Sequence, residues 1–228
     1  MGKSEKYNFP IGDNPGGNVG LIMSHIKENS FVLECGCASG YMTKYLAEKK
    51  KCVTHIVEID PECCEKASQY AVDWYCGDLE ENGWLRYYGS YPSYDYILFA
   101  DVLEHLRNPL EVLKKAITLL RDNGKVIISI PNICHNDILI RMFFNDWQYT
   151  GLGLLDETHI HFWGVNQLAR FIDEAGMKIT SYEAVAVPTQ CTEQKYQAEI
   201  PDEILNVLKK RQYGEVYQWV IVCERMKQ

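Results

Sequence analysis

The stretch from Phe31 to Leu46 most constrains how this chain can fold. It begins with a short apolar run, passes through a loop bounded by Gly36 and Gly40, and continues with apolar residues at helical spacing. The apolar run indicates a buried strand, and the glycines suit a tight turn or the close approach of a ligand. The stretch predicts a strand, a glycine loop and a helix, an arrangement that leaves backbone N–H groups free for a nucleotide-like ligand. Because Ala38 replaces a further glycine of a strict G-x-G-x-x-G motif, an ordinary strand-to-helix turn stays open as an alternative.

Strands and helices are predicted to alternate along the rest of the chain. Further strands are expected at residues 53–59, 74–76, 94–100, 125–130, 177–187 and 218–223. Helices are expected at residues 61–72, 109–120, 165–175 and 201–210, the second with Asn108 as its N-cap and a stop at Asn123-Gly124. This alternation predicts an α/β fold, a Rossmann-like and mostly parallel sheet with helices on both faces.

The chain shows no convincing internal boundary, and its 228 residues suffice for one sizeable core. A single domain over residues 1–228 is therefore predicted. Residues 1–29 form a polar lead-in, with a short helix before the first strand, that caps the domain. Residues 131–164 break the rhythm and carry aromatic side chains together with His135, Asp156, His159 and His161. That segment is predicted to be a lid or a wall of the substrate site.

Composition limits the classes of partner. Lys and Arg number 23 against 31 Asp and Glu, a net charge of −8, which argues against a nucleic-acid partner held through phosphates. No apolar run reaches the length of a membrane span, and the first residues lack a signal-peptide core. The nine cysteines do not have the spacing of structural zinc ligands, and several lie in apparent strands. A reduced, cytoplasmic protein is predicted, whereas the oligomeric state is left open.

Two acidic residues follow the second and third strands. Glu58 ends the second strand, can accept hydrogen bonds from both hydroxyls of a ribose, and follows Glu34 at close to the typical spacing of about 20 residues. Asp60 is an alternative ribose ligand, although its position before a proline favours helix capping. Asp78, followed by Leu79, suits the exocyclic amine of a base and the face of its ring, and an N-cap role for Asp78 is equally open.

The order of these motifs resembles the class I S-adenosylmethionine-dependent methyltransferases over residues 20–185. The motifs are Glu34-Cys-Gly-Cys-Ala-Ser-Gly40, Glu58-Ile-Asp60, Gly77-Asp-Leu79, Asp95-Tyr-Ile-Leu98 and the Gly124 turn. The resemblance implies a seven-stranded sheet with an antiparallel last strand and S-adenosylmethionine as cofactor. The residues it assigns to the methionine end, the ribose, the adenine and the pocket floor are Glu34, Gly36, Cys37, Ala38, Ser39, Gly40, Tyr41, Glu58, Ile59, Asp60, Asp78, Leu79, Ala100, Asp101, Val102 and His105.

Two shorter resemblances bear on metal and acceptor. The segment Asp101-Val-Leu-Glu104-His105 is similar to one in ubiquinone-biosynthesis O-methyltransferases, where an acid, a Glu and a His are linked to a divalent metal. On a helical turn these three residues would share a face. The Glu-His pair also occurs in methyltransferases without a metal, and no metal is predicted. The segment 154–162 is similar to one in bacterial methyltransferases that accompany sugar-transferring enzymes, which implies a small-molecule, glycan or lipid-linked hydroxyl as acceptor.

The predicted reaction is methyl transfer from S-adenosylmethionine to a hydroxyl. Such an acceptor needs a base near neutral pH, for which His159 is the first candidate and His161 the second. Alternatively, both histidines hold the lid through hydrogen bonds. Two other functions are kept open, a non-catalytic scaffold or regulator that binds S-adenosylmethionine or S-adenosylhomocysteine, and a nicotinamide-dependent oxidoreductase.

Overall fold

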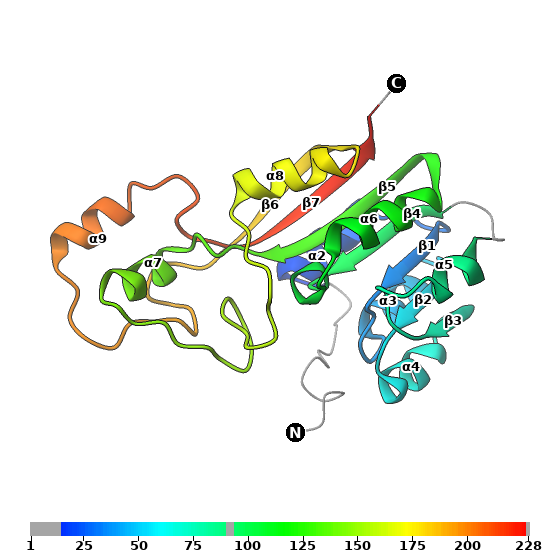
Figure 1. Ribbon diagram of the computed structural model, residues 1–228, viewed down its shortest axis with the longest axis horizontal. Coiled ribbons are helices and arrows are strands. Elements are labelled where there is room, and N and C mark those ends of the chain that lie inside the picture. The colour runs from blue at the N-terminus through cyan, green and yellow to red at the C-terminus, as the bar shows by residue number, and fades with distance from the viewer. Residues whose placement is uncertain (1–14, 90–93, 227–228) are drawn as a thin grey trace.

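The centre of the molecule is a seven-stranded sheet with the order β3-β2-β1-β4-β5-β7-β6 (Figure 1). The computed structural model describes residues 15–89 and 94–226, so the first half of the predicted lead-in lies outside the described residues. The strands are β1 (Phe31–Cys35), β2 (Val53–Glu58), β3 (Asp73–Cys76), β4 (Tyr94–Ala100), β5 (Leu120–Pro131), β6 (Met177–Ala186) and β7 (Val216–Arg225). β1 to β5 pair in parallel, and β7 runs antiparallel to both β5 and β6. The predicted fold class is confirmed.

Helices cover both faces of this sheet. They are α2 (Gly17–His25), α3 (Tyr41–Glu48), α4 (Pro61–Ser68), α5 (Gly83–Tyr88), α6 (Pro109–Thr118), α7 (Asn136–Phe143), α8 (Val165–Glu174) and α9 (Asp202–Leu208), with a 3₁₀ turn η1 at Leu103–His105. α2 and α3 pack on one face and α5, α6 and α8 on the other. Within the described residues no helix has both the length and the apolar character that crossing a membrane requires.

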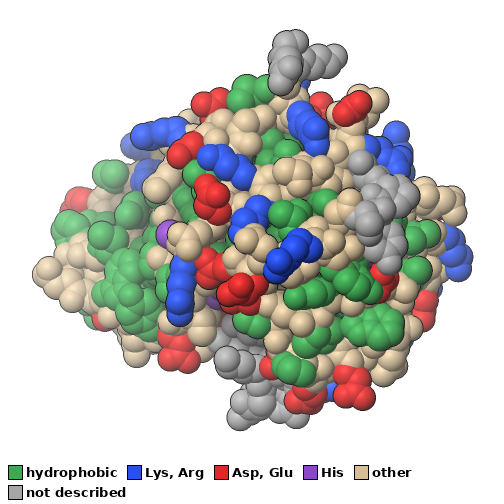
Figure 2. Space-filling model, turned by 45° about the vertical axis from the view of Figure 1, so that its right-hand side comes forward, with side chains coloured by type: hydrophobic (Ala, Val, Ile, Leu, Met, Phe, Trp, Pro, Cys, Tyr) green, Lys and Arg blue, Asp and Glu red, His purple; other side chains and the backbone are tan. Residues whose placement is uncertain are grey.

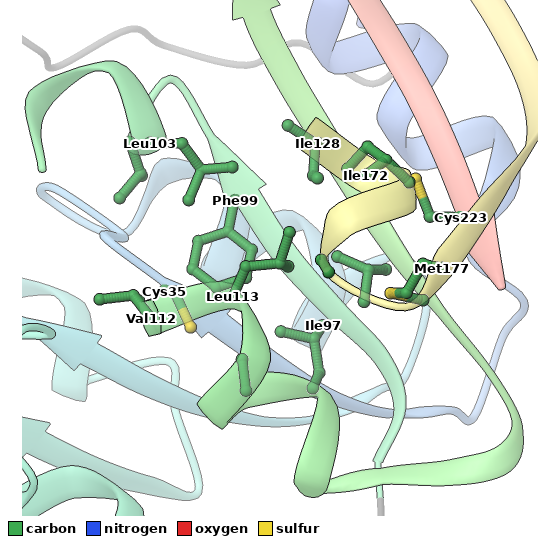
Figure 3. Close-up of a cluster of buried hydrophobic side chains, with 14 of the residues drawn as sticks. Cys35, Ile97, Phe99, Leu103, Val112, Leu113, Ile128, Ile172, Met177 and Cys223 are labelled. Atoms are coloured by element: carbon green, nitrogen blue, oxygen red, sulfur yellow. The ribbon is translucent and has the colours of Figure 1, made fainter. Parts of the chain in front are cut away.

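Alternation along β4 shows how one strand serves both layers. Ile97 and Phe99 belong to the cluster under α6 and α8, whereas Tyr96 and Leu98 belong to the cluster under α2 and α3. Figure 3 shows Ile97 and Phe99 beside Leu113 of α6. Because successive side chains of a strand point to opposite faces, a nearly continuous apolar run is what a strand covered on both sides needs.

The helix α4 ends four residues before the predicted boundary. It closes at Ser68, and the backbone N–H of Val72 donates to the carbonyl of Thr54 at 2.9 Å. Val72 therefore bonds to the neighbouring strand β2, although the helical spacing of apolar residues continues to this position.

The connection from α6 to β5 also differs from the prediction. Leu120, expected on the buried stripe of the helix, pairs with Tyr94 as the first residue of β5. The Asn123-Gly124 pair therefore lies within β5, near a register shift, and does not end the helix. Asn108 occupies the N-cap position of α6 without a capping hydrogen bond from its side chain, which donates to Glu80 at 3.2 Å.

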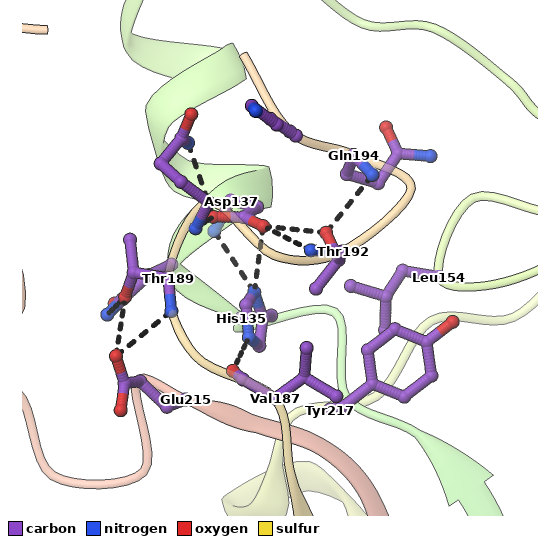
Figure 4. Close-up of polar contacts among 12 residues, drawn as sticks. His135, Asp137, Leu154, Val187, Thr189, Thr192, Gln194, Glu215 and Tyr217 are labelled. Carbon is purple, nitrogen blue, oxygen red and sulfur yellow. Dashed lines mark hydrogen bonds and ion pairs between the residues drawn. The ribbon is translucent and has the colours of Figure 1, made fainter.

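The predicted lid segment is joined to a second segment far along the chain. α7 and α9 lie together at one end of the molecule, beyond the ends of strands β5, β7 and β6 (Figure 1). Asp137 of α7 is fully buried and accepts hydrogen bonds from the backbone of Gln190 and from the backbone and hydroxyl of Thr192 (Figure 4). His135 is hydrogen-bonded to the Val187 carbonyl at 2.9 Å. Buried polar contacts of this kind hold residues 132–164 against residues 187–215.

Candidate cofactor and acceptor site

The two glycines of the loop after β1 adopt left-handed backbone conformations. Gly36 has φ +73° and Gly40 has φ +82°, both unfavourable for residues with a Cβ. A Cβ on Gly36 would lie 2.6 Å from a methyl of Val102, and one on Gly40 would lie 2.6 Å from the Cα of Ala67. The glycines therefore permit close packing of this loop against the segment after β4 and against α4.

Glu58 joins the loops that follow β1 and β2. Its Oε2 accepts a hydrogen bond from the backbone N–H of Ala38 at 2.8 Å, and its Oε1 accepts one from the N–H of Asp60 at 3.0 Å. The side chain is 8% exposed. An ionised carboxylate has about four acceptor positions, so each oxygen retains capacity for a ligand hydroxyl. Its position at the end of β2 agrees with the prediction, and its two loop contacts were not foreseen.

Asp60 and Asp78 shape turns in the next two loops. Asp60 is the N-cap of α4 and accepts from the backbone N–H groups of Glu62 and Cys63, so the capping alternative is confirmed. Asp78 accepts from the N–H of Glu80 at 2.8 Å, within a turn that precedes α5. The N-cap position of α5 belongs to Asn82, so Asp78 is not the cap of that helix.

The other predicted cofactor residues surround these turns. Leu79 and Cys37 are buried, Ser39, Tyr41 and Ala100 are partly exposed, and Ile59 is 63% exposed. Ala38 has φ +48°, which shows that an alanine is accommodated where the motif favours glycine. Because β1 to β4 are parallel, their carboxyl ends bring all these loops to one edge of the sheet, the usual binding edge of such folds.

Glu34 is a buried acid at the carboxyl end of β1. Its side chain is 1% exposed, and Oε2 accepts a hydrogen bond from the Thr43 hydroxyl at 2.7 Å. Oε1 has no hydrogen-bond partner within the described part of the chain. Burial, with a smaller contribution from the charge of Glu58, raises the pKa of Glu34 to about 8. A cationic group placed beside this oxygen would offset the cost of ionising it.

Asp101 follows β4 in a left-handed conformation, with φ +55°. Its carboxylate accepts hydrogen bonds from Asn18 of α2, Ser129 of β5 and Gln218 of β7. Burial raises the pKa of Asp101 to about 6, against the opposing effect of these three donors. The donors were missed by sequence reasoning because no motif marks them and each comes from a different element.

Beyond Asp101 the structure brings together Glu104, His105 and His159. One potential ligand atom from each lies within 4.8 Å of the others. Glu104 is 1% exposed, and burial together with the charges of Asp101 and Asp156 raises the pKa of its carboxyl well above the ordinary value. Asp101, predicted as the third member of an alternative metal set, is absent from this group. The turn is 3₁₀ only over residues 103–105, so the helical face assumed for Asp101 does not form.

A hollow adjoins this group at the carboxyl ends of β4 and β5. Its polar lining consists of Glu104, His159 and His161. Its apolar lining consists of Ile130, Pro131, Ile133, Leu154 and Phe162. His161 also stacks on Trp163 with ring centres 5.4 Å apart, and its Nε2 lies 3.3 Å from the Arg107 carbonyl. The hydrogen-bonded, lid-holding alternative thus describes the second histidine well.

A family model described as a methyltransferase domain matches residues 19–182. A malonyl-[acyl-carrier protein] O-methyltransferase from Anoxybacillus flavithermus is 31% identical over 103 residues, which are 43% of this chain and 38% of the relative. A probable (S)-tetrahydroprotoberberine N-methyltransferase 2 from Papaver bracteatum is 28% identical over 139 residues, 56% of this chain and 36% of the relative. The chain therefore aligns with little more than a third of either curated relative.

A solved structure extends the likeness over most of the fold. Magnesium protoporphyrin IX methyltransferase from Synechocystis PCC 6803, with bound S-adenosylhomocysteine, superposes with a TM-score of 0.58 at 13% identity, over 92% of this chain and 80% of that one. At 13% identity the superposition shows only that the two folds are alike. The family match covers residues 19–182, most of the chain, and this range includes the glycine loop and Glu58. The chain belongs to the class I S-adenosylmethionine-dependent methyltransferases, and its cofactor is S-adenosylmethionine.

Proposed function

We propose that this enzyme transfers the methyl group of S-adenosylmethionine to a hydroxyl of an uncharged acceptor, either a small molecule or a glycan- or lipid-linked group. The observation that carries the proposal is the hollow beside Glu104, whose described lining combines five apolar side chains with two histidines and contains no Lys or Arg. An acceptor carboxylate or phosphate would find no Lys or Arg partner in this lining. A hydroxyl fits a pocket that offers acceptors and titratable rings.

The cofactor residues keep their predicted roles in this proposal. Glu34, with one unpartnered oxygen beside the glycine loop, would receive the ammonium of the methionine end. Glu58 would accept from the ribose hydroxyls, and Asp78 and Leu79 would contact the adenine. Val102 packs on Gly36, and the hollow begins two residues later at Glu104. The acceptor hollow therefore adjoins the cofactor loops along the chain.

The protein's contribution to the chemistry is alignment and control of one proton. The sulfonium of the cofactor supplies an already activated methyl group. The apolar walls exclude water and orient the acceptor, a large part of the acceleration in transfers of this kind. His159 is 8% exposed and lines the hollow, so it is placed to promote loss of the acceptor's proton.

The surface near the lid supports an acceptor with an apolar portion. Hydrophobic side chains gather at the left-hand end of the view in Figure 2. Large apolar residues of the lid are strongly exposed, namely Met142, Phe143, Trp147, Tyr149 and Leu152. Contiguous exposed apolar side chains mark binding surfaces more often than isolated ones do. A lipid-linked or otherwise apolar acceptor would cover part of this surface.

The proposal is tested by measuring transfer of a labelled methyl group from S-adenosylmethionine to matched acceptor sets. Each set presents the same apolar group bearing a hydroxyl, an amine or a carboxylate, with glycosides and prenyl-linked sugars among the hydroxyl acceptors. Product is expected with hydroxyl acceptors, at rates at least tenfold above the matched amines and carboxylates. Transfer to the amines or carboxylates alone would overturn the choice of acceptor atom. Tight cofactor binding without transfer to any set would favour the scaffold alternative.

A further inference from the structure

Two segments meet in the Glu104, His105 and His159 group, which we call the Glu-His cluster. Glu104 and His105 belong to the turn after β4. His159 belongs to the lid loop, the part of the lid segment at residues 144–164 between α7 and α8. The backbone N–H groups of Ile160 and His161 both donate to the Glu104 carbonyl, at 2.9 and 3.1 Å. These bonds fasten the lid loop to the turn directly beside the cluster, so the proximity of the three side chains is built into the backbone.

The carboxylate of Glu104 is the unusual member. It is 1% exposed, and neither of its oxygens has a hydrogen-bond partner within residues 15–89 and 94–226. A buried polar group without a partner is costly, and buried carboxylates are normally paired or bound to a metal. Asp101 and Asp156 add negative charge around it. The surroundings of Glu104 therefore favour a bound cation.

The ring of His105 is held in the manner of a metal ligand. His105 Nδ1 lies 3.2 Å from the carbonyl oxygen of Thr158 and 3.1 Å from its hydroxyl, so a hydrogen on Nδ1 would be donated to Thr158. A metal-binding histidine almost always donates its other N–H to a carbonyl or carboxylate in this way. The ring centres of His105 and His159 are 4.7 Å apart at an interplanar angle of 67°, so the two rings are not stacked face to face.

We propose that Glu104, His105 and His159 bind a divalent transition-metal ion, with Zn²⁺ and Co²⁺ the best matches to two imidazoles and one carboxylate. Three such ligands leave one tetrahedral position open, and Glu104 and His159 both line the hollow. Zn²⁺ with bonds of about 2.0–2.2 Å holds its ligands roughly 3.4 Å apart, so side-chain rotations must draw the cluster inward from its span of up to 4.8 Å.

This inference deepens the proposed function, because the ion's role in catalysis rests on methyl transfer to a hydroxyl in the same hollow. A bound divalent ion lowers the pKa of a hydroxyl that binds to it. In the protein with the ion bound, His159 would promote deprotonation of the acceptor hydroxyl by holding the ion. Only in the ion-free protein would His159 act as a free base. Ion binding itself does not depend on which acceptor the enzyme uses.

The test is titration of the metal-free, full-length protein with Co²⁺, followed by visible absorption and by elemental analysis after dialysis. One equivalent is expected to bind with d–d bands and without the near-ultraviolet thiolate band that the exposed Cys76, Cys134 or Cys191 would produce. Glu104→Gln and His105→Ala are expected to weaken binding by more than tenfold. His161→Ala, in the same hollow and outside the cluster, is the matched control and should bind Co²⁺ as the wild type does.

Each outcome decides the inference. Equal Co²⁺ binding by the wild type and both cluster variants, or a thiolate band at one equivalent, would overturn it. Circular dichroism and S-adenosylhomocysteine binding establish that the variants fold. Glu104→Gln removes the carboxylate charge while keeping nearly the same side-chain size, so it changes the packing around residue 104 little. If the wild type binds no Co²⁺ while methyl transfer persists in the presence of a chelator, the metal site is refuted and the proposed function stands. If Co²⁺ binds but no acceptor set is methylated, the site stands and the proposed function fails.

Discussion

Replacing His159 by alanine is expected to lower kcat for methyl transfer about a thousandfold, the middle of the range for losing a group that controls a proton. His159 is the histidine that belongs to the Glu-His cluster and also lines the acceptor hollow. It is absent from the loops after β1, β2 and β3 that are expected to hold the cofactor. The dissociation constant for S-adenosylhomocysteine should therefore change less than threefold. Initial rates at saturating cofactor, together with calorimetric titration, measure the two quantities.

The matched control for this substitution is His25→Ala. His25 lies on α2, is paired with Glu183 of β6, and takes no part in the hollow. It should retain the wild-type rate. Full activity in His159→Ala would remove this histidine from the mechanism, and an equal loss of cofactor binding would assign it to the cofactor site instead.

The free energy of unfolding of the ligand-free enzyme is expected to fall as pH rises from about 5 to 8, and Glu34 is expected to cause much of that fall. Its pKa in the folded protein is about 8, against an ordinary value of 4.5. Between these values the folded state holds a proton that the unfolded chain releases. The stabilisation that this proton contributes is therefore fully present below the pKa of the unfolded chain, 4.5, and is lost as pH rises through the pKa of the folded protein, about 8. The pKa difference corresponds to about 5 kcal/mol of lost stability once Glu34 is ionised in the folded protein.

Glu34→Gln isolates this contribution. The variant should lose most of the decline in unfolding free energy between pH 5 and 8, measured by urea denaturation at each pH. Residual pH dependence is expected from Asp101 and Glu104, whose pKa values are also raised by burial. Glu48→Gln, on the exposed side of α3, is the control and should reproduce the wild-type slope. An unchanged slope in Glu34→Gln would contradict the assignment.

Local rules explain the parts of this molecule that the sequence predicted well. The glycine loop, the acid at the end of β2 and the Asp60 cap each depend on neighbours within a few residues, and all lie where they were expected. Strand identities followed from apolar runs, which sheets covered on both faces require. The resemblance to methyltransferases then supplied the seven-stranded sheet with an antiparallel last strand, which periodicity alone does not give.

The missed features depend on contacts between distant segments. Asp101 is held by Asn18, Ser129 and Gln218, and these residues come from three elements that pattern reading treats separately. The end of α4 was misplaced because Val72 pairs with Thr54 of β2, a contact that helical periodicity does not register.

The Glu-His cluster shows the same limit at the site itself. Sequence reading grouped Asp101 with Glu104 and His105 because they are neighbours in the chain, and it considered His159 separately. The backbone bonds from the lid loop to the Glu104 carbonyl bring His159 into the group, and the left-handed conformation at Asp101 precedes the turn. Similarly, residues 187–215 were not recognised as the support of the lid, because the buried Asp137 contacts join segments more than fifty residues apart.

The most direct test of the central claim is calorimetric titration with S-adenosylhomocysteine, beside NADH, of the wild type and Glu58→Ala. We expect micromolar affinity for S-adenosylhomocysteine, no measurable heat with NADH, and affinity at least tenfold weaker in Glu58→Ala. That substitution removes charge-assisted bonds, which contribute about 1.5–3 kcal/mol each, and with them the link between the β1 and β2 loops. Glu62→Ala, exposed on α4, is the control and should bind as the wild type does. Binding of NADH in place of S-adenosylhomocysteine, or equal affinity in Glu58→Ala, would contradict the cofactor site described here.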